Sequence, residues 1–373
     1  MTEATLTWRP DWAVPPGEIL AEALDERSMT QAELARRTNR PLKTINEIVK
    51  GKSAITPDTA LQFEVVLGVP ARFWLNLERD FSERRARVRE RVRLERDASW
   101  VERFPLTAMV RRGLIPRSND NADYLNELLK FFAVSSPTAW HNEWGRVQAS
   151  FRQSSAFAAS PESVSVWLRW GELQSQSLNP KPFDEDALAA ILPRLREMTR
   201  LAPMAFVPEL QELLSDCGVA VVLTPEIEGT HLSGAARWLS ANKAIVQLSL
   251  RHRNDDEFWT ALLHELRHLM RSKGRWGYLD ALGDATGLMD DESDADHFAR
   301  ELLIPTAVFE VFVAAGRFAP ADVRTFASSA GVSEGVVVGR LQRAGQIKPQ
   351  ALNYLKRPLK WSDEAFAVKA STL

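Results

Sequence analysis

Two histidines and a glutamate in the carboxy-terminal half have the types and the spacing of a catalytic metal site. His264 and His268 stand four positions apart in the stretch His-Glu-Leu-Arg-His, so on a helix they lie on one face and can bind one ion. Glu265 lies beside the first histidine and could act as a general base toward water. Histidine is scarce, at 6 of 373 residues, which makes a chance match of this spacing uncommon.

A catalytic zinc ion needs a third protein ligand and one open coordination position. Glu292, in a second acidic stretch downstream, can supply that ligand. Asp296 falls one turn further on the same helix face, where it could accept the free ring N–H of a ligand histidine. These spacings predict a zinc site of His264, His268 and Glu292, with Glu265 as base. The alternative is an amphipathic helix whose histidines are ordinary surface or core residues.

Two helices and a small sheet must position these residues. Asn254, Asp255 and Asp256 can cap the first helix, and Pro305 ends the second. Apolar residues recur at helical spacing in both: Phe258, Trp259, Leu262, Leu263, Leu266 and Leu269, then Ala295, Phe298, Ala299, Leu302 and Leu303. Ahead of them, three apolar runs predict strands over 218–223, 234–239 and 243–249, the last two joined by a hairpin turn.

The amino-terminal residues 16–80 predict five short helices separated by sharp turns. The second begins at the capping box Thr30-Gln-Ala-Glu and ends near Asn39, which can adopt the left-handed turn conformation. Pro41 suits the first turn of a third helix over 42–50, closed by Gly51. Two helices joined in this way form a helix-turn-helix, with 42–50 as the recognition helix.

Positive charge gathers around this predicted recognition helix. Between Arg36 and Lys52 there are six basic residues and one acid, Glu47, a surplus that suits contact with phosphates. Five side chains have the chemistry to contact base edges or phosphates: Gln31, Lys43, Thr44, Asn46 and Lys50. The alternative is a helical bundle that binds protein. A further arginine-rich segment, 82–100, predicts a solvated linker helix, or else an arm that contacts phosphate.

The composition is that of an ordinary globular protein, with 45% hydrophobic and 26% charged residues and a net charge of −2. That balance gives no global attraction to nucleic acid, so any basic patch must be local. Cys217 is the single cysteine, which excludes an internal disulfide and a cysteine-based zinc finger and suits a reducing cytosol. No signal peptide or membrane-length apolar run is present, so we expect a cytoplasmic protein without membrane contact.

The amino-terminal segment resembles a known family through Pro16-Gly-Glu-Ile-Leu, Thr30-Gln-Ala-Glu-Leu-Ala, Thr44-Ile-Asn-Glu-Ile and Phe73-Trp-Leu-Asn-Leu. These motifs are similar to those of the HigA branch of the XRE antitoxins. The resemblance implies binding to double-stranded operator DNA, typically as a homodimer, and repression of the protein's own operon. Asn39 replaces the usual turn glycine, and Pro41-Leu42 replaces a more polar start to the recognition helix.

Residues 218–305 resemble the ImmA/IrrE metallopeptidases, through Gly234-Ala-Ala-Arg-Trp-Leu, the His-Glu-Leu-Arg-His stretch and the acidic segment that follows. The resemblance implies a zincin-like fold and zinc-dependent endoproteolysis, with repressors as the best-known substrates. His264, His268 and Glu292 carry over as ligands and Glu265 as base. Asp294 is a second choice for third ligand. Arg267 stands where many members have glycine or alanine, so it could restrict the cleft or bind an acidic substrate.

We therefore expect a mainly α protein with a small β-sheet. The predicted parts are a helix-turn-helix domain over 1–80, a helical middle region over 81–215, and a zinc metallopeptidase domain with a helical tail over 216–373. The predicted function is a transcriptional regulator that cleaves or controls a repressor or antitoxin; its partner could be a toxin. The alternative is a HigA-like autorepressor whose metal domain is a non-catalytic sensor or scaffold. His231, Tyr278 and His297 are candidates for an oxyanion-stabilising role, and a structural role is the alternative for each.

Overall fold

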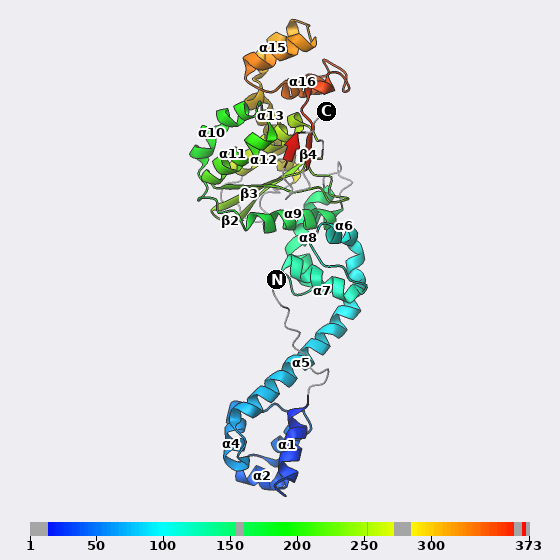
Figure 1. Cartoon of the computed structure of the whole chain (residues 1–373), viewed down its shortest axis with the longest axis vertical. Helices are drawn as coiled ribbons and strands as arrows, with labels where there is room; N and C mark the ends of the chain where they lie inside the picture. Colours follow the sequence, from blue (N-terminus) through cyan, green and yellow to red (C-terminus); the bar gives the residue numbers. More distant parts are fainter. Residues whose placement is uncertain (1–13, 154–159, 252, 272–284, 362–367, 371–373) are drawn as a thin grey trace. The chain divides into compact units, whose positions relative to one another are not determined.

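The computed structural model describes residues 14–153, 160–251, 253–271, 285–361 and 368–370. They form two compact units, one of residues up to 99 with 121–123 and one of the remainder. The fold is mainly helical, with an amino-terminal helix-turn-helix and a small three-stranded sheet, as the sequence predicts (Figure 1). The predicted boundaries at 80/81 and 215/216 fall within helices. Among the described helices, none has the length and apolar content needed to cross a membrane.

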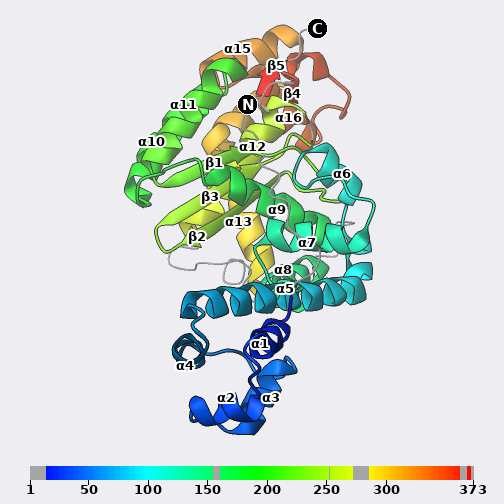
Figure 2. The same cartoon turned by 60° about the horizontal axis from the view of Figure 1, so that its bottom comes forward.

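The first unit holds the five predicted helices, two of which form the helix-turn-helix (Figure 2). The Thr30 hydroxyl accepts the Glu33 N–H at 3.1 Å and starts the second helix, and Asn39 has a φ of +52° in the turn after it, both as predicted. Their bounds are α1 (Pro16–Asp25), α2 (Gln31–Arg37), α3 (Leu42–Val49), α4 (Pro57–Leu67) and α5 (Ala71–Asp97).

The arginine-rich segment lies in α5, and most of its charge is neutralised locally. Arg87 pairs with Glu83 at 2.7 Å, and Arg93 pairs with Glu90 at 2.5 Å. Arg91 also pairs with Glu95 at 2.9 Å. Such pairing within one helix favours the solvated-helix interpretation of this segment over the phosphate-contacting arm.

Helices also make up the middle of the second unit. The sequence predicts them over 121–132, 164–174, 185–199 and 203–217, close to the observed positions. Helix α8 was not predicted, because Ser135-Ser-Pro is typical of a polar loop. The Ser136 hydroxyl accepts the Ala139 N–H at 3.0 Å and Pro137 occupies the first turn, so this stretch starts a helix. The bounds are η1 (Ala98–Arg103), α6 (Leu106–Arg111), α7 (Asn121–Phe132), α8 (Pro137–Gln153), α9 (Pro161–Ser175), α10 (Glu185–Met198) and α11 (Pro203–Asp216).

The three-stranded sheet has the order β1 (Val219–Leu223), β3 (Lys243–Leu248), β2 (Gly234–Ser240). The hairpin between β2 and β3 is antiparallel, whereas β1 runs parallel to β3, which the sequence analysis did not predict. Because β3 lies in the middle, β2 is an edge strand of this sheet. Figure 1 shows α9 on one side of the sheet and α10, α11 and α12 (Asp255–Arg271) on the other.

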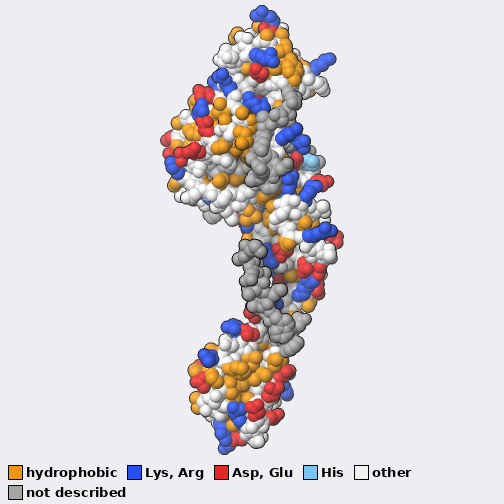
Figure 3. Space-filling view, in the orientation of Figure 1, with side chains coloured by type: hydrophobic (Ala, Val, Ile, Leu, Met, Phe, Trp, Pro, Cys, Tyr) orange, Lys and Arg blue, Asp and Glu red, His pale blue; other side chains and the backbone are white. Residues whose placement is uncertain are grey.

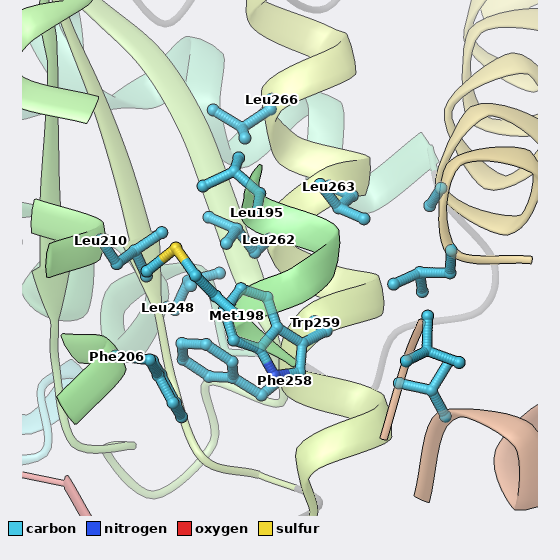
Figure 4. Close-up of a cluster of buried hydrophobic side chains, with 14 of the residues drawn as sticks. Leu195, Met198, Phe206, Leu210, Leu248, Phe258, Trp259, Leu262, Leu263 and Leu266 are labelled. Atoms are coloured by element: carbon cyan, nitrogen blue, oxygen red, sulfur yellow. The ribbon is translucent and has the colours of Figure 1, made fainter. Parts of the chain in front are cut away.

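The core of the second unit lies between the sheet and α12 (Figure 4). Trp259, Leu262, Leu263 and Leu266 of α12 are fully buried there, which confirms the predicted apolar face of this helix. The elements that follow are α13 (Ala285–Leu303), α14 (Thr306–Ala314), α15 (Pro320–Ala330), α16 (Glu334–Arg343), η2 (Asn353–Leu355), β4 (Leu359–Trp361) and β5 (Val368–Ala370).

The start of α12 is fixed by two buried aspartates. Asp255 accepts hydrogen bonds from the Ser333 hydroxyl and the Arg357 N–H, both at 2.9 Å, while burial raises its pKa above the usual range. The buried Asp256 carboxylate pairs with the buried Lys356 ammonium at 2.8 Å. The carboxy-terminal segment thereby sets the position of the helix that carries both histidines.

This buried pair predicts a stability effect. Lys356→Met leaves the Asp256 carboxylate buried without its cation, so we expect a loss of about 3–5 kcal/mol in the free energy of unfolding. Lys360→Met, at an exposed position on β4, is the control and should change it by less than about 0.5 kcal/mol. Urea unfolding measures both. Equal effects of the two substitutions would show that the buried pair does not anchor α12.

Candidate functional site

The structure brings the three predicted metal ligands together from two helices. His264 and His268 project from α12, one turn apart, and Glu292 projects toward them from α13. The Nε2 atoms of the two histidines lie 3.0 Å apart. A Glu292 carboxylate oxygen lies 3.1 Å from Nε2 of His264, and the other lies 3.5 Å from Nε2 of His268. Within the described part of the chain, these are the residues whose ligand atoms converge as a metal site would require.

These separations match what a tetrahedral zinc ion needs. With zinc–nitrogen and zinc–oxygen bonds of about 2.0–2.1 Å, the ligand atoms of a tetrahedral site lie about 3.3 Å from one another. The two histidine nitrogens lie 3.0 Å apart and one Glu292 oxygen lies 3.1 Å from His264, both close to that value. The 3.5 Å separation from His268 belongs to the other Glu292 oxygen. Side-chain exposures of 17% for His264 and 60% for Glu292 put the cluster at the surface, where a fourth position can remain open. The donor set therefore fits a zinc ion with an accessible side.

Asp296 lies behind the first histidine of the cluster, His264. Its carboxylate lies 2.9 Å from Nδ1 of His264, one helical turn beyond Glu292 on α13. An acceptor at Nδ1 keeps a proton on that nitrogen and turns the Nε2 lone pair toward Glu292 and His268. The pair thus selects the histidine tautomer that can bind a cation.

Glu265 is held beneath the edge strand β2. Its carboxylate accepts a hydrogen bond from the Ala236 backbone N–H, and burial raises its pKa to about 7. Gly234 leaves room for it, since a Cβ there would lie 2.8 Å from Glu265 Cγ. Ordinary side chains at this point of β2 would displace the glutamate. The sequence analysis singled out Gly234 only as part of a family resemblance, because the contact joins residues distant in the chain.

The charged groups of the cluster shift one another's pKa values. Burial by itself lowers the pKa of His264, but the hydrogen bond to Glu292 and the nearby carboxylates raise it to about 9. The same hydrogen bond lowers the pKa of Glu292. The cluster is therefore an acidic environment that stabilises a positive charge at its centre.

Asp294, the second choice for third ligand, is occupied elsewhere. Its carboxylate accepts a hydrogen bond from Arg267 at 2.6 Å and pairs with Arg271 at 3.1 Å, and the Arg267 bond lowers its pKa to about 2. The Arg267 guanidinium also lies 5.2 Å from the centre of the Phe298 ring. Arg267 thus joins α12 to α13 through Asp294, a role that neither the cleft-restricting nor the substrate-binding expectation included.

The three candidates for an oxyanion-stabilising role lie outside this cluster or outside the described residues. His231 has a φ of +52°, and its backbone carbonyl accepts a hydrogen bond from Arg251. His297 is exposed on α13. Tyr278 lies outside the described residues. The structure gives neither His231 nor His297 a contact with the ligand atoms.

The predicted DNA-contacting residues lie on α2 and α3, with Lys50 at the residue that follows α3. The Asn46 amide donates a hydrogen bond to the Gln31 side-chain oxygen at 3.2 Å, which joins the two helices. The Lys43 ammonium is 85% exposed and lies 3.8 Å from Glu47, while Lys50 is exposed and Thr44 partly buried. These side chains are positioned on the surface of the helix-turn-helix, where a nucleic acid can reach them.

Comparison with known proteins agrees with this amino-terminal arrangement. Residues 20–74 match the helix-turn-helix family. The HTH-type transcriptional regulator YddM of Escherichia coli K12 is 37% identical over 67 residues, which are 18% of this chain and 71% of YddM. Virulence-associated protein I of Dichelobacter nodosus is 39% identical over 67 residues, and the chain spans 62% of its length.

A solved structure of Pseudomonas aeruginosa antitoxin HigA with the higBA promoter is also similar. It is 34% identical in sequence, with 20% of this chain and 83% of HigA covered and a TM-score of 0.20. The family match and the identity to YddM give the chain its classification. Through its amino-terminal residues, the chain belongs to the helix-turn-helix family of transcriptional regulators.

Proposed function

We propose that the chain is a DNA-binding transcriptional regulator whose second unit is a zinc-dependent endopeptidase acting on a repressor-like or antitoxin-like protein. The observation that carries the proposal is the convergence of the His264, His268 and Glu292 ligand atoms beside a partly buried glutamate, Glu265. The proposal includes a zincin-like, ImmA/IrrE-type assignment for the second unit. A site used only to stabilise the fold needs no base next to its ligands.

Each residue of the cluster has a distinct part in this proposal. His264, His268 and Glu292 would hold the zinc ion, which when bound supplies Lewis acidity for peptide hydrolysis. Glu265 takes the proton of the attacking water, and a pKa near 7 suits a base at neutral pH. Asp296 orients His264 through Nδ1.

The edge strand β2 supports an extended peptide as substrate. Among the described residues, no strand pairs with its outer edge, and Glu265 lies beside it through Ala236. An extended segment can add to such an edge by main-chain hydrogen bonds. A flexible loop or tail of a protein meets that requirement, whereas a folded helix does not.

The helix-turn-helix would bring this activity to an operator. Operator binding is proposed from the family membership and from Lys43 and Lys50, which are exposed on the surface that α3 presents. Pseudomonas aeruginosa HigA was solved with its promoter DNA. We extend operator binding to this chain, as a homodimer on a two-fold site.

A second candidate function is a HigA-like autorepressor whose metal unit is a sensor or scaffold. The hydrogen bond from Ala236 to Glu265 favours it, because the glutamate then helps to hold α12 to the sheet instead of acting on water. Substitutions that separate metal binding from chemistry distinguish the two functions.

Asp296 and Asp294 offer a matched test of the metal site. Asp296→Asn removes the acceptor that fixes His264, so we expect zinc affinity to fall about 10–100-fold. Asp294→Asn should leave zinc affinity unchanged, because Arg267 and Arg271 hold that carboxylate. Competition with a chromophoric chelator measures both. A larger loss for Asp294→Asn would reassign the third ligand.

Glu265 and Glu292 should separate catalysis from metal binding. Glu265→Gln cannot accept the water's proton, so cleavage should fall about 10²–10⁴-fold while zinc is retained. Glu292→Gln should weaken zinc retention itself. Zinc content and cleavage of repressors from neighbouring operons are measured in parallel. If the Glu265→Gln variant still regulates its target as the wild-type protein does, the result would favour the sensor function.

DNA binding should depend steeply on salt, because phosphate contacts release counterions. Lys43→Ala should weaken all sequences alike and reduce the salt slope by about one, whereas Asn46→Ala should also relax sequence preference. Fluorescence anisotropy over a salt series measures both effects. Salt-independent affinity would rule out operator binding through α3.

A further inference from the structure

Leu42 is an exposed leucine at the first residue of the recognition helix α3. Its side chain is 51% exposed, whereas Ile45 and Ile48 of the same helix are buried at 0% and 2%. An exposed leucine alone says little, since apolar atoms cover much of any protein surface. Its position says more, because residues at the start of a recognition helix meet base edges in the major groove.

The side chains near Leu42 indicate which groups of a DNA duplex it would contact. Leu42 and Asn46 are four residues apart on α3, so their side chains lie on one face. Asn46 donates to Gln31 at 3.2 Å, so the amide on the leucine's face of α3 is paired with a second side-chain amide from α2. Lys43 lies next to it in the chain and is 85% exposed. An apolar side chain thus lies near an amide pair and an exposed cation.

This combination matches the chemistry of an adenine–thymine step. Asparagine and glutamine amides pair with N6 and N7 of adenine, and an apolar side chain contacts the C5-methyl group of thymine. Resting on the operator binding proposed above, we propose that Leu42 recognises a thymine methyl group beside an adenine that Asn46 and Gln31 contact. Leu42 is then a specificity-determining residue, and Lys43 supplies phosphate contact without base preference.

Other surfaces of the same unit do not have these neighbours. Leu61, Val65 and Phe73 are also exposed, on α4 and α5, and Figure 3 shows apolar side chains on this unit's surface. They belong to neither helix of the helix-turn-helix pair α2–α3. Leu61, at 55% exposed, is therefore a matched control for Leu42.

The test deletes the methyl group from the DNA. A duplex is first selected from a random library with the full-length chain, and each thymine is then replaced singly by deoxyuridine. At one or more thymines, uracil should weaken wild-type binding about fourfold, the value of one buried methyl group. Leu42→Ala should bind the thymine and uracil duplexes with equal affinity, while Leu42→Met and Leu61→Ala keep the response.

The outcomes separate this inference from operator binding itself. In one outcome, a duplex is selected and its binding depends on salt, but uracil has the same effect on wild type and Leu42→Ala at every thymine. This result would overturn the role of Leu42 and leave operator binding intact. If uracil leaves the affinity of the wild-type protein unchanged at every thymine, the role of Leu42 is also overturned, and no variant is needed to show it. If no duplex is enriched, operator binding fails and this inference fails with it. Thermal melting of each variant confirms folding.

Discussion

The second unit is built around one cluster, formed by His264, His268 and Glu292, that requires a positive charge at its centre. The Nε2 atoms of His264 and His268 lie 3.0 Å apart with the Glu292 carboxylate beside both, and Glu265 and Asp296 add further negative charge. Lone pairs this close repel unless a cation lies among them. A proton on His264 meets the requirement, as its pKa of about 9 indicates, and a zinc ion meets it with more ligands at once. Metal binding and proton release are thus coupled at this cluster.

The rest of the second unit holds the residues of this cluster in place. Buried leucines and Trp259 fix one face of α12 on the sheet, so its histidines point away from the core. Asp255 and Asp256 fix the beginning of the helix to the carboxy-terminal segment. Ala299 and Leu303 of α13 are buried in the same core, and this packing brings Glu292 and Asp296 beside the histidines. A rigid support of this kind is what a preformed ion site needs.

Local patterns in the sequence predicted much of this arrangement. The spacing of His264 and His268, the turn at Asn39 and the apolar face of α12 depend on residues close in the chain, and each lies where helix geometry places it. Apart from the approach of Glu292 and Asp296 to the histidines, contacts between distant residues were not predicted. The parallel pairing of β1 with β3, the pairing of Arg267 with Asp294, and the space that Gly234 leaves for Glu265 are of this kind. Helix α8 was missed for another reason, because Ser-Pro signals both a turn and a helix start.

The most direct test of the account is the metal itself. Elemental analysis and X-ray absorption of the full-length chain should give about one zinc per chain, with two imidazole nitrogens and one carboxylate ligand at about 2.0–2.1 Å. Stoichiometric zinc should disappear in His264→Ala and His268→Ala. A chain that retains no zinc at neutral pH, or retains the same amount in both variants, would contradict the assignment of His264, His268 and Glu292 as the ligand set.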